Sequence, residues 1–357
     1  MADELLVETV TKLFAQTCGH DEVEAAEAAG WAAGVWDPFH ASGFTGVSLP
    51  EELGGSGGNL DDACEVVRLA GAHAAPIPVA EAGMLGGWLL TGAGMELPTG
   101  PVTVVPGEPG DELCLDGTTL TGVAHHVPWA RQAAVIVALL PDGDGDDDGW
   151  VVVACQGADA RIEHRTNLAG EPRDVVHFEG IAVERAAAAD GVDADAFRLR
   201  GALSRALLMA GALEAMSHLT VEYTAERQQF GRPVGRFQAV QQHLVWSAQD
   251  AALVKMAAQV AARELERGPA TFEVASAKLL ANQAAGSATR ACHQAHGAMG
   301  MTREYPLHHL SRRLWAWRTE YGGEHEWSTR IGRTVAAAGA DRLYPIVTGG
   351  SRALAAS

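Results

Sequence analysis

The candidate metal ligands in this sequence are two pairs of neighbouring histidines and one run of acidic residues. The pairs are His125-His126 and His308-His309. Adjacent residues point to different faces of a helix or strand, and no carboxylate or cysteine completes a recognisable ligand set. The run from Asp142 to Asp148 resembles a calcium loop, but Asp147 stands where an EF-hand has glycine. We interpret the run as a solvated hairpin tip and predict no metal site.

The cysteines give no sign of a disulfide framework. The chain has 5 of them, an odd number, at wide spacing and without a C-x-x-C pair: Cys18, Cys64, Cys114, Cys155 and Cys292. This pattern favours neither disulfides nor a thiolate zinc site, and it suits a reducing compartment.

Charge and hydropathy narrow the class of protein. Lys and Arg total 26 against 45 Asp and Glu, a formal net charge of -19. Such a chain repels a polyanion, which argues against a nucleic-acid binder. With 47% hydrophobic residues it can bury a core, yet no apolar run reaches the roughly 18–20 residues of a membrane helix. The acidic start, MADELLVETV, is unlike a secretory signal. We expect a cytoplasmic globular protein that binds neither nucleic acid nor membrane.

Hydrophobic periodicity predicts three parts and an α+β fold class. Helices are expected over 4–17, 25–36, 60–72 and 83–91, with a break at Asp37-Pro38 and a Gly-rich loop over 49–58. Short β-rich runs follow over 102–105, 134–140, 150–153 and 174–178, and long helices return over 197–227, 238–267, 272–298, 305–317 and 328–338. The predicted domains are an N-terminal helical domain (1–99), a small middle β domain (100–190) and a C-terminal four-helix bundle (191–357).

Three motifs give this layout a family resemblance. The first is LPEELGG at 49–55, and the second is ERQQFGRP at 226–233, followed by Phe237, Gln238 and Gln241. The third is QAHGAMG at 294–300, followed by EYP at 304–306. In this order and spacing they resemble the acyl-CoA dehydrogenase family, which has an N-terminal helical domain, a middle β domain and a C-terminal four-helix bundle.

The resemblance implies an FAD that lies across a subunit interface. Arg227 would then give a fixed cation to the pyrophosphate of a neighbouring subunit's FAD, because a guanidinium donates to phosphate in pairs. Gln294 and Gly297 would bring backbone close to the dinucleotide. The implied cofactor-binding residues are Arg227, Gln229, Phe230, Phe237, Gln238, Gln294, Gly297 and Ala298. The alternatives stay open: a surface arginine, a C-cap glycine, and ordinary interhelical hydrogen bonds for Gln238 and Gln241.

The family's catalytic carboxylate is missing from both of its usual positions. A Glu in a "YEGT" loop removes the α proton of the acyl-CoA in most members, and here Tyr321 or Gly322 stands at that position. Other members place the base on the first bundle helix, where this chain has Gly201. Glu324 is the best placed substitute, ahead of Glu320 and Glu326; the alternative is that all three are solvated loop carboxylates.

The middle domain also departs from the family. Members that hold the flavin ring use "TEP…GSD" and "WITN" segments. The corresponding stretches here, VTVVPGEPGD at 102–111 and VAHHVPWARQ at 123–132, lack the Gly-Ser-Asp and keep only Trp129 as a match.

Three functions remain open. The sequence favours the base-lacking subunit of a heteromeric acyl-CoA dehydrogenase, which completes the FAD site of a sister subunit. The resemblance implies an acyl-CoA thioester substrate, with a sterol side chain as one candidate, and an electron-transferring flavoprotein as acceptor. The second is a self-sufficient flavoenzyme with a displaced base such as Glu324, and the third is a helical protein without flavin. Because the long helices carry more apolar surface than one bundle covers, we predict a dimer of dimers.

Overall fold

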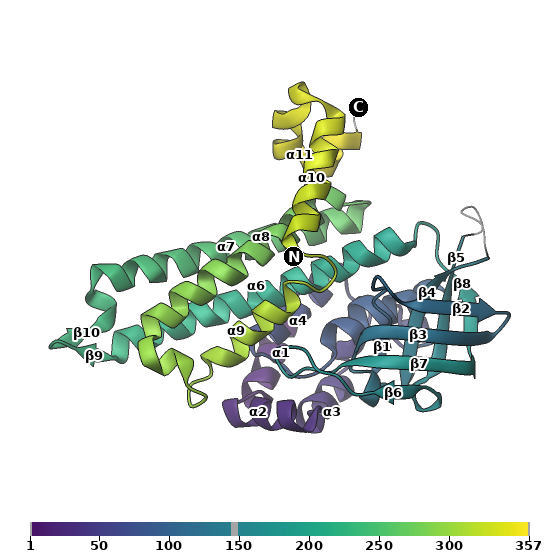
Figure 1. Cartoon of the computed structure of the whole chain (residues 1–357), viewed down its shortest axis with the longest axis horizontal. Coiled ribbons are helices and arrows are strands. Elements are labelled where there is room, and N and C mark those ends of the chain that lie inside the picture. The colour runs from purple at the N-terminus through teal and green to yellow at the C-terminus, as the bar shows by residue number, and fades with distance from the viewer. Residues whose placement is uncertain (1, 144–148, 356–357) are drawn as a thin grey trace. The chain divides into compact units, whose positions relative to one another are not determined.

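The computed structural model describes residues 2–143 and 149–355, and the chain forms two compact units (Figure 1). The first comprises Met1–Thr17, Asp21–Val66 and Pro76–Gly201, and the second Cys18–His20, Val67–Ala75 and Ala202–Ser357. Most of the N-terminal helical residues and the strands from Val102 to Ala187 therefore share the first unit, whereas Val67–Ala75 belongs to the second. The tip of the acidic run, residues 144–148, lies outside the described residues.

The N-terminal part is helical, as predicted, but the predicted bounds of one helix were wrong. The helices are α1 (Glu4–Thr17), α2 (His20–Ala29), α3 (Ala33–Ala41), α4 (Leu60–Ala72), the π-helix Ala80–Gly87 and α5 (Trp88–Gly92). The single helix expected over 25–36 is two helices, because Gly30 adopts φ 75 and ends α2. Pro38 does not end α3 but lies inside it. Burial of Val35, Trp36 and Phe39 outweighs the one hydrogen bond that the proline removes.

The middle part is a pair of facing four-stranded sheets. One has the order β1 (Val102–Val104), β4 (Val135–Pro141), β5 (Trp150–Gln156), β8 (Glu184–Ala187); the other has β2 (Glu112–Asp116), β3 (Thr119–Pro128), β7 (Arg173–Ala182), β6 (Arg161–Glu163). Inward side chains of both sheets, such as Ile136, Val153, Leu120 and Phe178, form one buried core. The predicted β structure of the middle region is confirmed. Four strands of these two sheets, β2, β3, β6 and β8, were not predicted. The residues of β2, for example, are largely exposed and contain no apolar run.

The second unit is built on four long helices that lie alongside one another (Figure 1). They are α6 (Ala194–Glu226), of which Ala202 onward belongs to this unit, α7 (Gln238–Arg267), α8 (Thr271–His296) and α9 (Leu307–Trp317). A short hairpin, β9 (Gln228–Gln229) and β10 (Arg232–Pro233), joins α6 to α7 at one end of the helices. Helices α10 (Glu324–Ala338) and α11 (Leu343–Ala355) follow. The predicted α+β fold class is confirmed.

Helix α7 has an unusual distribution of side chains. Its buried face holds small residues: Ser247, Ala251, Val254, Ala258, Ala261 and Ala262. Its larger apolar side chains are 43–58% exposed, and we call them the outer α7 face: Val245, Trp246, Leu253, Met256 and Val260. Small residues let α7 and α8 approach closely, while the outer face remains uncovered in the single chain. Among the described residues, no helix is both long and apolar enough to cross a membrane.

Candidate functional site

A cavity of about 450 Å³ lies at the hairpin end of the second unit. Its walls come from the ends of α6 and α8, the start of α7 and the hairpin. Every residue of the predicted cofactor set except Gln238 lines it: Arg227, Gln229, Phe230, Phe237, Gln294, Gly297 and Ala298. Gln238 begins α7 and is exposed outside the cavity. The volume falls within the roughly 300–1,000 Å³ of small-molecule sites, so motifs far apart in sequence meet at one ligand-sized cavity.

Arg227 is an unneutralised cation in this cavity. Its side chain is exposed, and among the described residues it has no acidic partner. The backbone beneath it is fixed, because its N–H donates to Tyr223 O at 2.9 Å and its carbonyl accepts the Val234 N–H at 2.8 Å. The chain has a net charge of -19, yet this arginine has a fixed backbone and no paired carboxylate among the described residues. Such a guanidinium is suited to bind a phosphate.

The hairpin tip presents an aromatic ring to solvent. Phe230 and Gly231 both have positive φ, 52 and 79, as the two central residues of a type I′ turn do. Phenylalanine is disfavoured in this conformation, and its ring is 91% exposed. The Phe237 ring meets it edge-on at 6.0 Å between centroids, and the Arg232 guanidinium lies 4.2 Å above Phe237. A strained turn with an exposed ring is a feature expected of a contact made with another molecule.

Gly297 is a helix C-cap that faces the cavity. It has φ 63, and its N–H donates to the carbonyls of Gln294 and His293 at the end of α8. A Cβ there would meet no atom of the chain within 4 Å. The positive φ favours glycine at this residue, which agrees with the alternative that Gly297 is a helix C-cap. The space beside Gly297 is open to the cavity.

Sequence reasoning missed three aromatic residues at this end of the bundle. The rings of Tyr223 and His296 stack at 4.4 Å between centroids, and Tyr305 contacts them from 5.4 and 5.0 Å. Tyr223 could have been found, because it precedes Arg227 by one helical turn and so shares its face. Burial raises the pKa of Tyr305, and the nearby carboxylate of Glu222 adds to this rise.

The turn after α9 has no room for a side chain at residue 322, although Glu326 Oε2 lies 3.3 Å from the position that its Cβ would take. Gly322 has φ 108, and a Cβ at this residue would lie 2.4 Å from Trp327 Nε1. Trp327 is 1% exposed, and its indole N–H donates to Tyr321 O at 3.2 Å. The ring therefore fills the space in which a side chain at residue 322 would start. Tyr321, the other residue aligned with the family's base, also has a positive φ of 53 and is buried.

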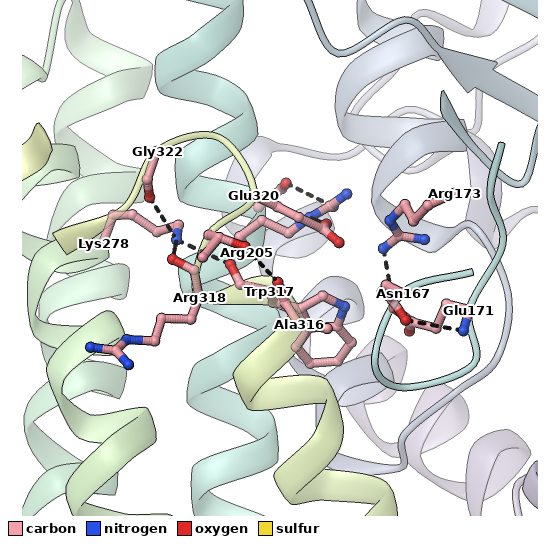
Figure 2. Close-up of polar contacts among 12 residues, drawn as sticks. Asn167, Glu171, Arg173, Arg205, Lys278, Ala316, Trp317, Arg318, Glu320 and Gly322 are labelled. Atoms are coloured by element: carbon pink, nitrogen blue, oxygen red, sulfur yellow. Dashed lines mark hydrogen bonds and ion pairs between the residues drawn. The ribbon is translucent and has the colours of Figure 1, made fainter. Parts of the chain in front are cut away.

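A buried lysine fixes this turn from below (Figure 2). Lys278 Nζ donates to the carbonyls of Trp317, Arg318 and Gly322 at 3.0–3.2 Å and to Asn282 Oδ1 at 2.7 Å. Burial lowers the pKa of Lys278 to about 7. The ammonium takes up carbonyls that the C-terminus of α9 leaves without helical partners. Contacts from α8 therefore hold the turn in addition to its own hydrogen bond from Gly322 N to Thr319 O at 3.3 Å.

A second cation lies against the same turn. Arg205, 1% exposed, donates through Nε to Glu320 Oε2 at 2.6 Å, and its guanidinium carbon lies 5.1 Å from the centre of the Tyr321 ring. Cations next to a carboxylate favour its charged form. Glu320 is therefore held in an ion pair with a buried arginine.

Glu324 has none of the properties of a general base that titrates near neutral pH. It is the first residue of α10, and its side chain is 40% exposed. Its carboxylate accepts from Arg318 Nη2 at 2.8 Å and from Gln283 Nε2 at 3.4 Å. The hydrogen bond from Arg318 lowers the pKa of Glu324. The carboxylate is thus exposed, paired and easily ionised.

The alternative base position on α6 is also without a carboxylate. Gly201 is buried there, and Arg200 precedes it. Arg200 Nε donates to Met84 O at 2.6 Å, and the guanidinium lies 4.5 Å from the centre of the Trp88 ring. Burial lowers the pKa of Arg200 to about 10. The polar side chain at this place is a cation engaged with the protein's own backbone.

Trp129 in the middle part is packed into the protein. Its side chain is 4% exposed and meets Trp31 edge-on at 6.2 Å. Two residues later, Arg131 Nη2 lies 2.5 Å from the fully buried carboxylate of Asp174. In the segment that matches "WITN", Trp129 is therefore packed internally and Arg131 is paired with a buried carboxylate.

Comparison with known proteins agrees with this geometry. The family profile described as "Acyl-CoA dehydrogenase, N-terminal domain" matches residues 2–96, and "Acyl-CoA dehydrogenase, C-terminal domain" matches residues 198–335. Acyl-CoA dehydrogenase IpdE2 of Mycobacterium tuberculosis is 29% identical over 319 residues, which cover 85% of this chain and 88% of that protein.

Two solved structures share the fold. The ChsE4-ChsE5 complex from Mycobacterium tuberculosis superposes with a TM-score of 0.84 at 22% identity, covering 95% of this chain and 99% of that one. The Tcur3481-Tcur3483 steroid ACAD G363A variant superposes with a TM-score of 0.79 at 23% identity, covering 93% and 97%. The chain belongs to the acyl-CoA dehydrogenase family, whose members are FAD-dependent oxidoreductases that act on acyl-CoA.

Proposed function

We propose that this chain is the subunit of a heteromeric acyl-CoA dehydrogenase that completes a sister subunit's FAD site and carries no base of its own. One contrast within the second unit supports the proposal. The cavity around Arg227 is open and holds a free cation, whereas the turn at Gly322 is closed against any side chain by Trp327. A self-sufficient dehydrogenase needs a carboxylate base in addition to a cofactor site, and Gly201 and Gly322 stand at the family's two base positions.

The residues of the cavity fit the nucleotide half of FAD. Arg227 would hold the pyrophosphate, and the amides of Gln229 and Gln294 would donate to or accept from the same part of the cofactor. Phe230 would lie against the cofactor from the hairpin tip. FAD, when bound, accepts the hydride that leaves the β carbon of the acyl-CoA; the isoalloxazine ring and the base would belong to the sister subunit.

The self-sufficient alternative has less support. Its best candidate base, Glu324, is exposed, paired with Arg318 and lowered in pKa. A general base is most effective when its pKa lies near the operating pH. In the active assembly we expect Glu324→Gln to change the turnover number by less than about threefold, whereas loss of a true base costs several powers of ten. A loss of that size would favour the self-sufficient reading.

The outer α7 face supplies a surface for assembly. Trp246, Leu253 and Val260 follow one another at intervals of seven residues, which places them on one stripe of the helix. A contiguous apolar patch on a helix of a cytoplasmic protein marks an interaction site. We propose that it contacts the sister subunit within a dimer of dimers. An acyl-CoA with a sterol side chain as substrate, and an electron-transferring flavoprotein as acceptor, are parts of the same proposal.

Flavin content per chain tests the proposal directly. The chain is expressed alone, purified, and its visible absorbance between 350 and 500 nm is compared with its protein concentration. We expect little or no flavin, and flavin bound with acyl-CoA turnover only after co-expression with a sister subunit that has Glu in its "YEGT" loop. About one flavin per chain from the protein expressed alone, bleached by acyl-CoA, would contradict the heteromeric role.

The role of Arg227 is tested by a matched pair of variants. In the flavin-containing assembly, Arg227→Ala is expected to lower retained flavin at least tenfold, because a charge-assisted contact to phosphate is lost. Arg236→Ala is the control, since Arg236 is an exposed arginine nine residues later that does not line the cavity. Equal flavin content in both variants would show that Arg227 does not hold the pyrophosphate.

A further inference from the structure

One nitrogen in the wall of the cavity has no hydrogen-bond partner. His296, the last residue of α8, is 4% exposed. Its Nδ1 lies 2.8 Å from Cys292 O, and since a carbonyl can only accept, Nδ1 must carry the proton. In the neutral ring, Nε2 is then an acceptor. This atom is buried, and within the described part of the chain nothing donates to it.

The surroundings hold the ring in this state. Burial lowers the pKa of His296, and the neighbouring His293 lowers it further. Tyr223 of α6 stacks on one face of the ring, and Tyr305, which precedes α9, meets it from the side. Three elements thus fix the orientation of a neutral imidazole. Glu222 and Glu226 act on Tyr305, and Arg227 lines the same cavity.

An unsatisfied buried nitrogen needs an explanation, because leaving one without a partner costs about 1–3 kcal/mol. A methionine or phenylalanine at residue 296 could pack on Tyr223 without this cost. The cavity that His296 lines also holds Arg227 and Gln294, groups suited to a nucleotide phosphate and its neighbours. The acceptor and the cation therefore belong to the same candidate site.

We propose that His296 Nε2 is the acceptor for an uncharged hydrogen-bond donor, a sugar hydroxyl or the adenine amino group, of the nucleotide whose phosphates Arg227 binds. The inference rests on the proposed function and adds to it a residue that distinguishes one nucleotide from another. Tyr223 and Tyr305 act by positioning the imidazole.

The test measures ADP and FAD affinity of the purified protein, in the assembly that it forms, by titration calorimetry. His296→Phe keeps a ring against Tyr223 and removes the acceptor, and we expect about tenfold weaker binding. His296→Gln returns an acceptor oxygen and should recover part of the affinity. His325→Phe is the control, since His325 is an exposed histidine of α10 outside the cavity.

Two ADP analogues separate a direct contact from a structural effect. Inosine diphosphate lacks the adenine amino group, and 2′,3′-dideoxy-ADP lacks the sugar hydroxyls. If His296 contacts one of these donors, the wild-type protein and His296→Phe bind the corresponding analogue equally, although they differ for ADP. If His296→Phe weakens ADP and both analogues by the same factor, or binds ADP as tightly as the wild-type protein, the inference is wrong.

The outcome is independent of the heteromeric role. A chain that holds flavin by itself and turns over acyl-CoA would contradict the proposed function while leaving the His296 contact to be measured in the same way. Conversely, unchanged ADP affinity in His296→Phe would remove this contact and leave the base-lacking role standing.

Discussion

Trp327 Nε1 lies 2.4 Å from the position that a Cβ on Gly322 would occupy. The same nitrogen donates to Tyr321 O at 3.2 Å, so the indole is held in this place by the turn that it fills. Gly322, one of the two residues aligned with the family's base, is therefore fixed as glycine for two separate reasons, its φ of 108 and the adjacent ring.

We expect Gly322→Glu to destabilise the protein and to give no acyl-CoA turnover. A side chain at this φ costs about 1–3 kcal/mol, and displacing a buried indole adds about 1–3 kcal/mol. Urea unfolding measures the loss. Gly323→Ala is the control, because Gly323 has φ -85 and a Cβ there meets no atom within 4 Å. Acyl-CoA turnover by a well-folded Gly322→Glu variant would show that the turn opens readily.

Lys278→Met is expected to lower the free energy of unfolding by about 1–3 kcal/mol, because buried carbonyls of Trp317, Arg318 and Gly322 lose their donor. Lys255→Met is the matched control: Lys255 is partly exposed and pairs with Glu214 at 2.8 Å, a contact worth about 0–1 kcal/mol. Denaturant unfolding compares the two variants. Equal midpoints would mean that the turn holds its conformation without the lysine.

Leu253→Asp should shift the protein to smaller species, because a charge at the centre of the outer α7 face must be desolvated on assembly. Light scattering after gel filtration gives the mass. Leu5→Asp is the control, since Leu5 is 71% exposed on α1, in the other unit. If both variants keep the mass of the parent protein, the outer α7 face is not an interface.

Mild acid should weaken the fold before the carboxylates titrate. Burial lowers the pKa of His73, His293 and His296 below 6.5. In the window below 6.5 the unfolded chain therefore binds more protons than the folded one, so stability falls as pH falls. Melting temperatures between pH 7.5 and 5 measure this slope. It should become shallower in His296→Phe and stay unchanged in His325→Phe; a flat wild-type profile would show that these histidines titrate normally.

Short-range sequence patterns were sufficient to predict the long helices, the family and the missing carboxylate. The 3.6-residue period located the long helices from α6 to α9, and the motifs around Arg227 and Gln294 indicated the family. Both motifs lie at helix ends and line one cavity, as the family resemblance implied. The absence of a carboxylate at Gly322 and Gly201 could also be read directly from residue types.

Tertiary structure decided what those residues do. Pro38 lies inside α3 because Val35, Trp36 and Phe39 are buried, and no local propensity contains that information. The partners of Lys278 lie about forty residues away in the chain, and Trp327 excludes a side chain at Gly322 only because the turn folds back onto α10. The unpartnered Nε2 of His296 likewise depends on three elements that meet around one ring. Packing between distant segments sets burial, and burial sets the charge, the free space and the hydrogen bonds that remain for a ligand.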